Sequence, residues 1–576
     1  MKIESVTLHN FRSYKDATIF LCDYSLLIGE NNVGKTGFIS ALRMFYEDDG
    51  LKYTPARDFP KFDTDDEESW MEISYLIDDD EYNGLKEEYR SSDYKLKVRK
   101  YFKGNKAAAN QSNIYAYENG VLSENLFYGA KNISQAKLGK VIYIPEISTA
   151  DDTLKLSGPS PFREMVNFVM KKAIKDSSSF KALEQAFDIF NKDFRDEEAT
   201  KEEGLSIKHL VNDINVSIGQ WQIEFGIDIN PIKPEEITKN LLAHYIEDEN
   251  LDGKRVSINS YGQGLQRHLI FTLIRLSSKY SEKKIERKKD FNPDFVLILF
   301  EEPEAFLHPA QQEILNINLQ KLSQEDNQQL VITTHSPTFA SRNIEDLKCM
   351  IRLDKKGAVT SAYQLSLRDI TDLFDENLSM FKFLSSKSAD MTVPIELRKQ
   401  IIQRQLGDPN ADLSKKLEEE SIKYFLWLDS ERSSLFFAKH IIICEGATEK
   451  VLLDYLINNI WIAVKEKHIY FLDAMGKYNI HRYMNLFNKL GLSHSVLMDA
   501  DEDRGVHGII NEFINNNKNI FTKEIYAFDK DIEDFLDIPV APRPDLKPLN
   551  IMYCYNNCIF DSVKLDKLFE VLLTLI

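Results

Sequence analysis

Apolar and polar residues alternate in the first part of the chain with the two-residue period of β-strands. This alternation is clear in Ile3–Leu8, Trp70–Ile77 and Tyr94–Tyr101, whereas Ser25–Ile28 is a short continuous apolar run. A run of that kind predicts a strand that is buried on both faces. Gly34–Phe45 carries its apolar residues at helical spacing. We therefore expect a strand-rich start with one early helix.

The pattern becomes helical and strongly charged in residues 160–250. Apolar side chains recur there at three- and four-residue intervals, for example between Phe180 and Phe190, which predicts an inserted helical domain or arm. An alternation of strands and helices returns in residues 255–352, and residues 366–435 are again helical and polar.

A second series of strands and helices begins at Lys439 and extends to about residue 540. The predicted strands are His440–Cys444, Ile469–Leu472, Ser495–Met498 and Glu524–Phe528, and the predicted helices are Ile480–Leu490 and an amphipathic Leu565–Leu575. Strands that alternate with helices predict a parallel sheet. We expect an α/β fold with more than one domain, because 576 residues exceed the size of one compact core.

Hydrophobic residues make up 43% of the chain and charged residues 28%, as in soluble globular proteins. No apolar run reaches the roughly 18 residues of a membrane helix, and the alternating N-terminus lacks the apolar core of a signal peptide. We therefore expect a cytoplasmic protein with no membrane partner. Five cysteines are too few for a disulfide framework and are expected to be ordinary thiols: Cys22, Cys349, Cys444, Cys554 and Cys558.

The net charge of −19 argues against a surface that binds nucleic acid without sequence preference. A local basic stretch, Lys95–Lys103, could still contact DNA. The alternative is that this stretch forms the solvated face of an antiparallel strand, and we favour that interpretation.

Residues 29–36 have the pattern G-x-x-x-x-G-K-T and lie between a predicted buried strand and a predicted helix. Glycines let the backbone curl so that N–H groups point at phosphate oxygens, and the helix N-terminus favours negative charge. We expect Lys35 to reach the β- and γ-phosphates of ATP, and Thr36 to bind Mg²⁺. The nucleotide-binding residues predicted in this P-loop are Gly29, Asn31, Asn32, Gly34, Lys35 and Thr36. A glycine-rich turn that matches by chance would not explain the strand and the helix on either side.

An apolar run, Phe295–Phe300, leads directly into Glu301 and Glu302. A buried strand that ends in carboxylates is the Walker B arrangement, in which one carboxylate holds Mg²⁺ and the next polarises the attacking water. We predict these roles for Glu301 and Glu302, respectively. A further apolar run, Leu330–Thr334, ends at His335, which is expected to face the γ-phosphate.

Ser260–Arg267 resembles the signature loop of ABC ATPases, and its Gly262 and Gly264 suit a phosphate. In those ATPases the loop contacts the nucleotide of a partner subunit, so the resemblance implies a dimer. The opening segment Leu8–Tyr14 is similar to that of RecF and SMC-like ATPases, which adds Arg12 to the expected nucleotide site. No long heptad arm separates the two halves, which argues against a true SMC protein.

Carboxylates follow two of the predicted strands in the last third of the chain. Glu445 follows His440–Cys444, and Asp499 and Asp501 follow Ser495–Met498. The ends of parallel strands lie along one edge of a sheet, so these side chains are expected to converge. Residues i and i+2 of an extended chain point the same way, which would let Asp499 and Asp501 bind one metal ion together.

A glutamate at one strand end and an Asp-x-Asp pair after an intervening βα unit resemble the pattern of Toprim domains, which occur in topoisomerases, primases and nucleases. Hard oxygen ligands suit Mg²⁺ or Mn²⁺, and two such ions can hold the attacking and leaving oxygens of a phosphodiester. A second acidic segment, Asp531–Asp534, is expected near the same edge. The alternative is an acidic surface loop, which we favour for Glu502 and Asp503 alone.

An ABC-type ATPase joined to a C-terminal Toprim domain resembles the OLD (overcoming lysogenisation defect) family of nucleases, a group that includes the nuclease subunit of the Gabija antiphage system. The P-loop, Glu301–Glu304 and Phe425–Ala438 with the following strand carry the resemblance most clearly. It implies an endonuclease that cuts DNA with two metal ions, uses ATP as regulator or fuel, and acts in antiphage defence.

The resemblance also implies site residues. Glu445 and Glu449 are the implied metal ligands or general base, and Asp499 and Asp501 are implied metal ligands. Glu533 resembles a later carboxylate of the family that also binds metal. Lys547 resembles a lysine that lies near the scissile phosphate, although a solvated loop lysine is almost as good an interpretation.

The implied architecture is an ABC-type ATPase domain at 1–365 with a helical insert at about 155–250, a helical linker at 366–438, and a Toprim domain with a C-terminal helix at 439–576. The insert is a candidate for dimerisation. The implied cofactors are ATP and Mg²⁺ or Mn²⁺. The implied partners are DNA and a second copy of the chain, and a helicase-like protein often accompanies such enzymes.

Two alternatives stay open. The ATPase could be a sensor whose Toprim domain cuts RNA such as tRNA, or the protein could be a DNA-binding clamp that does not cleave. Comparing DNA with tRNA as substrate separates the first alternative from a DNA endonuclease. The intact set of Glu445, Asp499 and Asp501 argues against the second.

Overall fold

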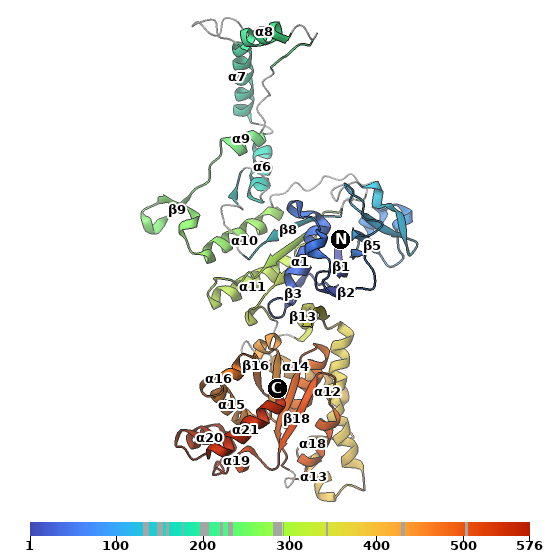
Figure 1. Ribbon diagram of the computed structural model, residues 1–576, viewed down its shortest axis with the longest axis vertical. Helices are drawn as coiled ribbons and strands as arrows, with labels where there is room; N and C mark the ends of the chain where they lie inside the picture. Colours follow the sequence, from blue (N-terminus) through green and yellow to red (C-terminus); the bar gives the residue numbers. More distant parts are fainter. Residues whose placement is uncertain are drawn as a thin grey trace. The chain divides into compact units, whose positions relative to one another are not determined.

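Figure 1 shows the computed structural model of the chain. It describes residues 1–130, 138–146, 154–156, 161–174, 177–195, 207–218, 223–227, 234–279, 291, 293–340, 344–427, 432–501 and 505–576. The chain forms two compact units, one made of Met1–Glu146, Lys288–Glu304 and Pro309–Ile576, the other of Ile147–Arg287 and Ala305–His308. No helix in the described ranges combines the length and the apolar character needed to cross a membrane.

The first sheet of the larger unit is antiparallel and comes from the strand-rich start of the chain. Its strands, in order across the sheet, are β2 (Tyr14–Phe20), β1 (Lys2–Phe11), β4 (Ser69–Leu76), β5 (Lys95–Lys103), β6 (Ile114–Glu118) and β7 (Val121–Leu126). Two short helices, α2 (Pro55–Asp58) and α3 (Asp79–Gly84), lie in its connections. Alternate residues of β1 are buried, and the fully buried Leu8 pairs with the equally buried Met71. The strands predicted from alternation are confirmed.

The second sheet is mainly parallel and contains the strand that leads into the P-loop. Its strands, in order, are β14 (Val359–Tyr363), β13 (Met350–Lys356), β3 (Tyr24–Ile28), β12 (Gln328–Thr333), β11 (Val296–Glu301) and β8 (Lys140–Ile144). Helix α1 (Lys35–Tyr46) follows β3, and α11 (Pro309–Ser323) connects β11 to β12. Because β3, β12 and β11 are adjacent and parallel, the segments that follow them meet at one edge of the sheet.

One apolar core joins the two sheets to α1. It includes Leu8 and Ile73 of the antiparallel sheet, Phe38 of α1 and Leu299 of the parallel sheet, all of them fully buried. The P-loop and the carboxylates after β11 are therefore attached to a single packed body.

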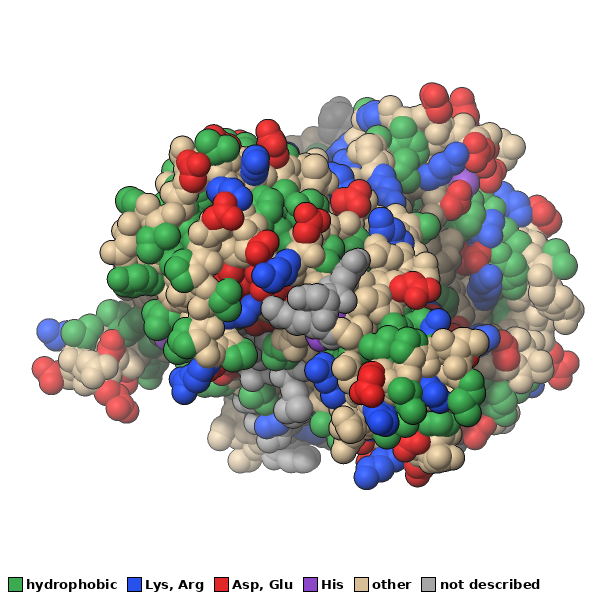
Figure 2. Space-filling model, turned by 90° about the horizontal axis from the view of Figure 1, so that it is seen from below, with side chains coloured by type: hydrophobic (Ala, Val, Ile, Leu, Met, Phe, Trp, Pro, Cys, Tyr) green, Lys and Arg blue, Asp and Glu red, His purple; other side chains and the backbone are tan. Residues whose placement is uncertain are grey.

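The basic stretch of β5 is already paired with carboxylates. Lys97 and Arg99 each lie 2.7 Å from Glu72, and Lys95 lies 2.8 Å from Glu4. This agrees with a strand face whose cations are balanced by neighbouring strands, and not with a surface that is open to DNA. Figure 2 shows the same balance on one face of the molecule, where Lys and Arg side chains are interspersed with Asp and Glu.

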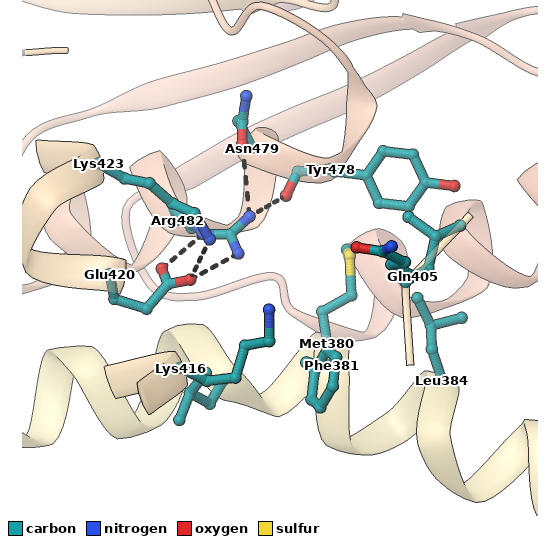
Figure 3. Close-up of a pocket in the computed structure, with 12 residues that line it drawn as sticks. Met380, Phe381, Leu384, Gln405, Lys416, Glu420, Lys423, Tyr478, Asn479 and Arg482 are labelled. Carbon is teal, nitrogen blue, oxygen red and sulfur yellow. Dashed lines mark hydrogen bonds and ion pairs between the residues drawn. The ribbon is translucent and has the colours of Figure 1, made fainter. Parts of the chain in front are cut away.

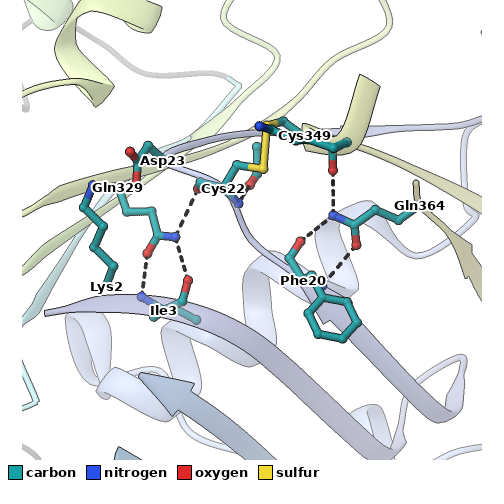
Figure 4. The surroundings of a disulfide bond; sticks show 10 residues. Lys2, Ile3, Phe20, Cys22, Asp23, Gln329, Cys349 and Gln364 are labelled. Carbon is teal, nitrogen blue, oxygen red and sulfur yellow. Dashed lines mark hydrogen bonds and ion pairs between the residues drawn. A yellow bond between two sulfur atoms is a disulfide. The ribbon is translucent and has the colours of Figure 1, made fainter. Parts of the chain in front are cut away.

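A disulfide bond joins Cys22 and Cys349 (Figure 4). The expectation of ordinary thiols is wrong for this pair, while Cys444, Cys554 and Cys558 are free. The two bonded cysteines precede β3 and β13, which are neighbours in the parallel sheet, so their Cα atoms come within 5.5 Å. Their separation of 327 residues hides this proximity in the sequence.

Two side-chain amides next to the disulfide connect the sheets (Figure 4). Gln329 of β12 donates a hydrogen bond to the carbonyl of Ile3 on β1 at 2.8 Å and accepts one from its N–H at 2.9 Å. Gln364 does the same for Phe20 on β2, at 2.7 and 3.1 Å. Each amide thus bonds the backbone N–H and carbonyl of one residue in the antiparallel sheet.

The smaller unit is mostly helical. Its elements are α6 (Pro161–Ile174), α7 (Ser178–Arg195), α8 (Ile207–Ile218), α9 (Pro234–Asn240), the hairpin of β9 (Ile246–Asp248) and β10 (Lys254–Val256), and α10 (Gln263–Lys279). A small apolar cluster joins Leu154, Met165, Ile258 and Leu273. The helical character expected between 160 and 250 is confirmed in its described residues, whereas a role in dimerisation stays a prediction.

Three helices, α12 (Leu367–Ala389), α13 (Ile395–Gln403) and α14 (Leu413–Trp427), follow the ATPase sheets. They contain the polar helical stretch expected after residue 366. Part of the segment Phe425–Ala438 that supports the family resemblance, residues 428–431, lies outside the described residues.

The last sheet is parallel throughout and has the strand order β16 (Ile469–Asp473), β15 (His440–Cys444), β17 (His494–Asp499) and β18 (Thr522–Phe528). Its helices are α15 (Ala447–Asn459), α16 (Ile462–Lys465), α17 (Lys477–Lys489), α18 (His507–Asn516), α19 (Ile532–Phe535), α20 (Lys547–Asn556) and α21 (Ser562–Leu575). Figure 1 shows α15 and α16 on one side of the sheet and α12 and α18 on the other. Helix α17 begins three residues before the predicted Ile480, because its polar first turn carries no apolar signal.

Contacts hold α17 along its length. The ring of His481 donates from Nε2 to the carbonyl of Asn377 on α12 at 3.0 Å, and Asn485 donates to the side-chain oxygen of Asn377 at 3.0 Å. Just beyond the end of α17, the Gly491 carbonyl accepts a 3.0 Å hydrogen bond from Arg352 of β13. Helix α17 is thus fixed both to the helical linker and to the ATPase sheet.

Candidate functional sites

The P-loop adopts the backbone conformation that its glycines allow. Gly29 and Gly34 have φ angles of 142° and 115°, values that residues with a Cβ rarely adopt. An added Cβ at Gly29 would also lie 2.5 Å from the carbonyl oxygen of Leu353. Lys35 folds back onto the loop and donates to the carbonyls of Gly29 at 2.7 Å and Glu30 at 2.8 Å. Burial lowers the pKa of Lys35 to about 8.

Of the other residues predicted to bind the nucleotide near the P-loop, three are exposed to solvent and Arg12 is hydrogen-bonded within the protein. Asn31, Asn32 and Thr36 are exposed, and Thr36 lies in the first turn of α1. Arg12 donates to Asp58 at 3.0 Å and to Ser40 on α1 at 3.1 Å, so it contacts the P-loop helix from the neighbouring sheet. Exposed groups at a helix N-terminus are placed to receive phosphate.

Glu301 and Glu302 lie where β11 ends, next to the strand that leads to His335. One oxygen of Glu301 accepts a 2.6 Å hydrogen bond from Tyr143, and its other oxygen is buried with no hydrogen-bond donor among the described residues. A buried carboxylate oxygen in that condition fits a bound cation. Glu302 has a φ of 43°, and its Oε1 lies 3.2 Å from Nε2 of His335.

The protonation of this pair follows from burial. Burial, together with the charges of Glu146 and Glu304, raises the pKa of Glu302. Burial and the nearby Lys35 lower the pKa of His335 to about 4, so this ring is neutral near pH 7. A carboxylate with a raised pKa next to a neutral imidazole is suited to exchange protons with water.

Glu304 has a role that the sequence did not reveal. Its Oε1 accepts hydrogen bonds from the Thr334 hydroxyl at 2.6 Å and from the N–H groups of His335 at 2.7 Å and Ser336 at 3.2 Å. It therefore holds the segment that presents His335. The only signal in the sequence was its place at the end of the Glu301–Glu304 segment.

The predicted signature loop lies in the smaller unit. Gly262 is exposed, and Gly264 lies in the first turn of α10, which begins at Gln263. Gln266 donates to the carbonyl of Tyr261 at 3.0 Å and so folds back over the turn. Nucleotide contact by this loop stays a prediction.

An acidic cluster lies at the carboxyl edge of the last sheet. Glu445 directly follows β15, Asp499 is the last residue of β17, and Asp501 comes two residues later. One ligand oxygen from each lies within 4.8 Å of the others, a grouping that can hold a metal ion. The N–H of Asp499 donates to Glu445 at 3.1 Å, which joins the two strand ends. The predicted convergence is confirmed.

The reason that Asp501 joins the cluster differs from the one predicted. Its φ is 49°, in the left-handed region, so the chain turns after β17 and does not continue as extended strand. The N–H groups of Ala500 and Asp501 donate to carbonyls of Phe528 at 2.8 Å and Lys530 at 3.3 Å, which holds this turn beside the end of β18. The predicted extended alternation is therefore wrong at Asp501. Residues 502–504, which include Glu502 and Asp503, lie outside the described residues.

Glu449 and Asp499 share a low-dielectric space. Glu449 lies in the first turn of α15, is 4% exposed, and accepts a hydrogen bond from the N–H of Gly446 at 3.1 Å. Burial and the charge of Glu445 raise the pKa of Glu449. Burial and repulsion from Glu449, Glu445 and Asp501 raise the pKa of Asp499, whose Oδ1 is buried without a donor among the described residues. Carboxylates packed in this way fit a divalent cation, which relieves their repulsion.

Glu533 and Lys547 form an ion pair at the same edge. Glu533, in the first turn of α19, is fully buried, and its Oε2 lies 3.1 Å from Nζ of Lys547. Burial lowers the pKa of Lys547, but the ion pair with Glu533 outweighs this and raises it. Lys547 is the first residue of α20 and a partner of a buried carboxylate, so the interpretation as a solvated loop lysine is wrong.

Lys477 is a member of the cluster that the sequence did not reveal. Its side chain is 1% exposed, and its Nζ donates to the carbonyl of Asp499 at 2.5 Å. The same atom lies 3.4 Å from Asp501 Oδ2 and 3.5 Å from Glu445 Oε2. The available signal was its place four residues after the end of β16, the strand that lies beside β15 in the sheet.

A cavity of about 200 Å³ lies between α12, α14 and α17 (Figure 3). Glu420 on its wall is almost fully buried and accepts two hydrogen bonds from Arg482, at 2.6 and 2.9 Å, and one from Lys423 at 2.6 Å. These contacts lower the pKa of Glu420 against the opposing effect of burial. The cavity wall is thus an ion-pair network that connects the helical linker to α17.

Comparisons with known protein families match two parts of the chain. The family model described as AAA ATPase domain matches residues 1–340, more than half of the chain. The family model described as Overcoming lysogenization defect protein-like, TOPRIM domain matches residues 436–501, which include the acidic cluster from Glu445 to Asp501. These two domain types imply the use of a nucleotide and of a divalent metal ion.

Two curated relatives extend over most of the chain. Endonuclease GajA of Bacillus cereus (strain VD045) is 22% identical over 523 residues, which cover 87% of this chain and 75% of that protein. Old nuclease of Escherichia phage P2 is 21% identical over 511 residues, which cover 87% of this chain and 77% of that protein. Among solved structures, Stu0660 of Streptococcus thermophilus matches with a TM-score of 0.36 and 10% identity, covering 69% of this chain and 84% of that one.

Proposed function

Since the chain belongs to the AAA ATPase domain family and carries an OLD-like Toprim domain, we propose that it is a metal-dependent DNA endonuclease whose cleavage is controlled by ATP. The observation that carries the proposal is the convergence of Glu445, Asp499 and Asp501 at one sheet edge. The names of the two relatives, an endonuclease and a nuclease, support the reaction.

The acidic cluster has the donors that a divalent ion requires. Glu445, Asp499 and Asp501 would hold one ion, and Glu449 and Glu533 extend the same edge for a second. Bound Mg²⁺ or Mn²⁺ supplies Lewis-acid stabilisation of the phosphate charge and a lower pKa for a coordinated water. Where Glu449 does not ligate the second ion, its buried place beside Glu445 and Asp499 would let it accept a proton from the attacking water. Lys547 adds a cation that can contact a phosphate oxygen.

In the ATPase site, different residues would bind the phosphates, hold Mg²⁺ and orient the attacking water. Lys35 would leave the Gly29 and Glu30 carbonyls for the phosphates, and Thr36 and Glu301 would hold Mg²⁺. Glu302, in contact with His335, would orient the attacking water. We further propose a dimer in which Gly262 and Gly264 complete the partner's nucleotide site, and a role in antiphage defence with a helicase-like protein as a further partner.

The direct test is cleavage of supercoiled plasmid with Mg²⁺ or Mn²⁺, with and without ATP. We expect nicked or linear product from the wild type and a loss of roughly 100-fold or more in Glu445→Gln, which removes a charged ligand but keeps the side-chain shape. Glu512→Gln, on the exposed face of α18, is the matched control and should cleave like the wild type. Equal cleavage by Glu445→Gln would reject the assignment.

The same assay run on tRNA addresses the alternative substrate. Cleavage of tRNA and not of plasmid would move the proposal to a sensor ATPase with an RNA-cutting Toprim domain. Plasmid binding with no cleavage of either substrate would favour a clamp.

A further inference from the structure

Lys477 is held rigidly by the turn in front of α17. The N–H of Ala474 donates to the carbonyl of Cys444 at 2.9 Å, and the N–H of Gly476 donates to the carbonyl of Glu445 at 2.8 Å. Gly476 has a φ of 107°, which a residue with a Cβ rarely adopts. The backbone of β15 therefore fixes the start of α17 beside the acidic cluster.

Helix stability does not explain a lysine at this position. The N-terminus of a helix has a partial positive charge, and a cation there is unfavourable. A buried ammonium group is also costly unless its N–H groups are matched by acceptors. Lys477 occupies the first position of α17 with a 1% exposed side chain, so both costs apply. Its neighbours in the cluster must compensate for them.

The surrounding oxygens match the three donors of an ammonium group. Nζ faces the carbonyl of Asp499, Oδ2 of Asp501 and Oε2 of Glu445, at 2.5, 3.4 and 3.5 Å. Oε2 of Glu445 also accepts from the N–H of Asp499, and Oδ2 of Asp501 lies 3.8 Å from Nδ1 of His507. Oε2 of Glu445 and Oδ2 of Asp501 are therefore both directed toward nitrogen groups of the protein, Lys477 among them. Oδ1 of Asp499, by contrast, is buried without a donor among the described residues.

We propose that Lys477 is a resident cation of the acidic cluster, a positioning residue that keeps one oxygen of Glu445 and one of Asp501 away from the metal. Each of these carboxylates then offers only its remaining oxygen to a divalent ion. The fixed positive charge also opposes metal binding, so the metal affinity of the site is lower than its carboxylates alone would produce. This inference rests on the proposed metal site.

Mn²⁺ titration by calorimetry without DNA tests the proposal on the full chain. In Lys477→Met we expect the Kd for Mn²⁺ to fall about tenfold, because the opposing charge is lost and two oxygens become available. At saturating Mn²⁺ we expect plasmid cleavage to fall about tenfold or more, because the ion is no longer held at its original oxygens. Lys489→Met, at the other end of α17 and paired with Glu376 at 3.0 Å, is the matched control and should keep the wild-type Kd.

A lysine that only stabilises the fold would give the opposite sign, with a higher Kd and lower activity together. An unchanged or higher Kd in Lys477→Met would therefore overturn the proposal. If that variant does not fold, the anomalous signal of Mn²⁺ in crystals of the wild type decides. Nζ within about 4 Å of one oxygen of both Glu445 and Asp501 supports the proposal. A Mn²⁺ ion that has displaced Lys477 from both Glu445 and Asp501 overturns the proposal.

The result is separable from that of the nuclease assay. A tighter Mn²⁺ site in Lys477→Met with no cleavage of DNA by the wild type would support the resident cation and reject the DNA endonuclease function. Plasmid cleavage by the wild type together with an unchanged Kd for Mn²⁺ in Lys477→Met would support the DNA endonuclease function and reject the resident cation.

Discussion

His481 shows how burial makes a single side chain sensitive to acid. It is fully buried on α17, its Nε2 donates to the carbonyl of Asn377, and burial lowers its pKa to about 3. In the unfolded chain the pKa returns to about 6.5, so the unfolded state binds more protons between these two values. The free energy of unfolding therefore decreases as the pH falls below about 6.5, by about 2 kcal/mol at pH 5 from this residue alone.

His481→Gln tests this dependence, because glutamine keeps a donor for the Asn377 carbonyl but does not titrate in this range. Thermal melts in EDTA at pH 7.5 and pH 5 should show a larger loss of Tm in the wild type than in the variant. Parallel losses in the two proteins would show that His481 does not contribute to acid sensitivity.

Single residues also show what the sequence could predict about the sites. Glu445, Asp499 and Asp501 were found from their places after predicted parallel strands, since topology alone brings strand ends together. Lys477 and Glu304 were missed, because their partners are set by turns whose course depends on hydrogen bonds between distant segments. The left-handed backbone of Asp501 was missed for the same reason.

At the scale of elements, the ion pair of Glu420 with Arg482 connects α14 to α17 inside the protein. Removing one member of a buried pair leaves the other uncompensated and costs about 3 kcal/mol or more. We therefore expect Glu420→Gln to lower Tm by several degrees in a thermal melt. Glu418→Gln, exposed on the same helix, is the control and should melt like the wild type. Equal melting of both variants would show that the pair contributes nothing to stability.

Elements differed in how well the sequence predicted them. The sequence predicted β1, β4 and β5 of the first sheet, β3, β11 and β12 of the second, and all four strands of the last, because buried strands are apolar and half-buried strands alternate. It did not predict the other strands of the first two sheets, which are β2, β6, β7, β8, β13 and β14. The first turn of α17 was not predicted either, since Lys477 faces carboxylates and not apolar residues. The Cys22–Cys349 disulfide was missed because the adjacency of β3 and β13 depends on the strand order of the sheet.

At the scale of the whole molecule, Arg352 connects the ATPase sheet to the acidic cluster through α17. It lies on β13, beside the P-loop strand β3, and donates to carbonyls at the end of α17, whose first residue is Lys477. Arg352→Met leaves these buried carbonyls without their donor, which should cost about 2 kcal/mol of unfolding free energy. We also expect ATP to change the rate of plasmid cleavage less in this variant than in the wild type.

The measurements are a chemical denaturation curve and the cleavage assay with and without ATP. Arg368→Met, at an arginine that is 90% exposed, is the control for both. If Arg352→Met keeps the full response to ATP, any signal between the two sites does not pass through this contact.

The disulfide closes a covalent ring that contains most of the ATPase region. Cys22 and Cys349 enclose all of the smaller unit, residues 147–287 and 305–308, between them in the chain. A single protease cut within that unit would therefore open the ring without releasing a fragment. The strand that carries the P-loop and the strand next to it would stay joined, and the cut protein would run as one species on a gel until a reductant separated it into two.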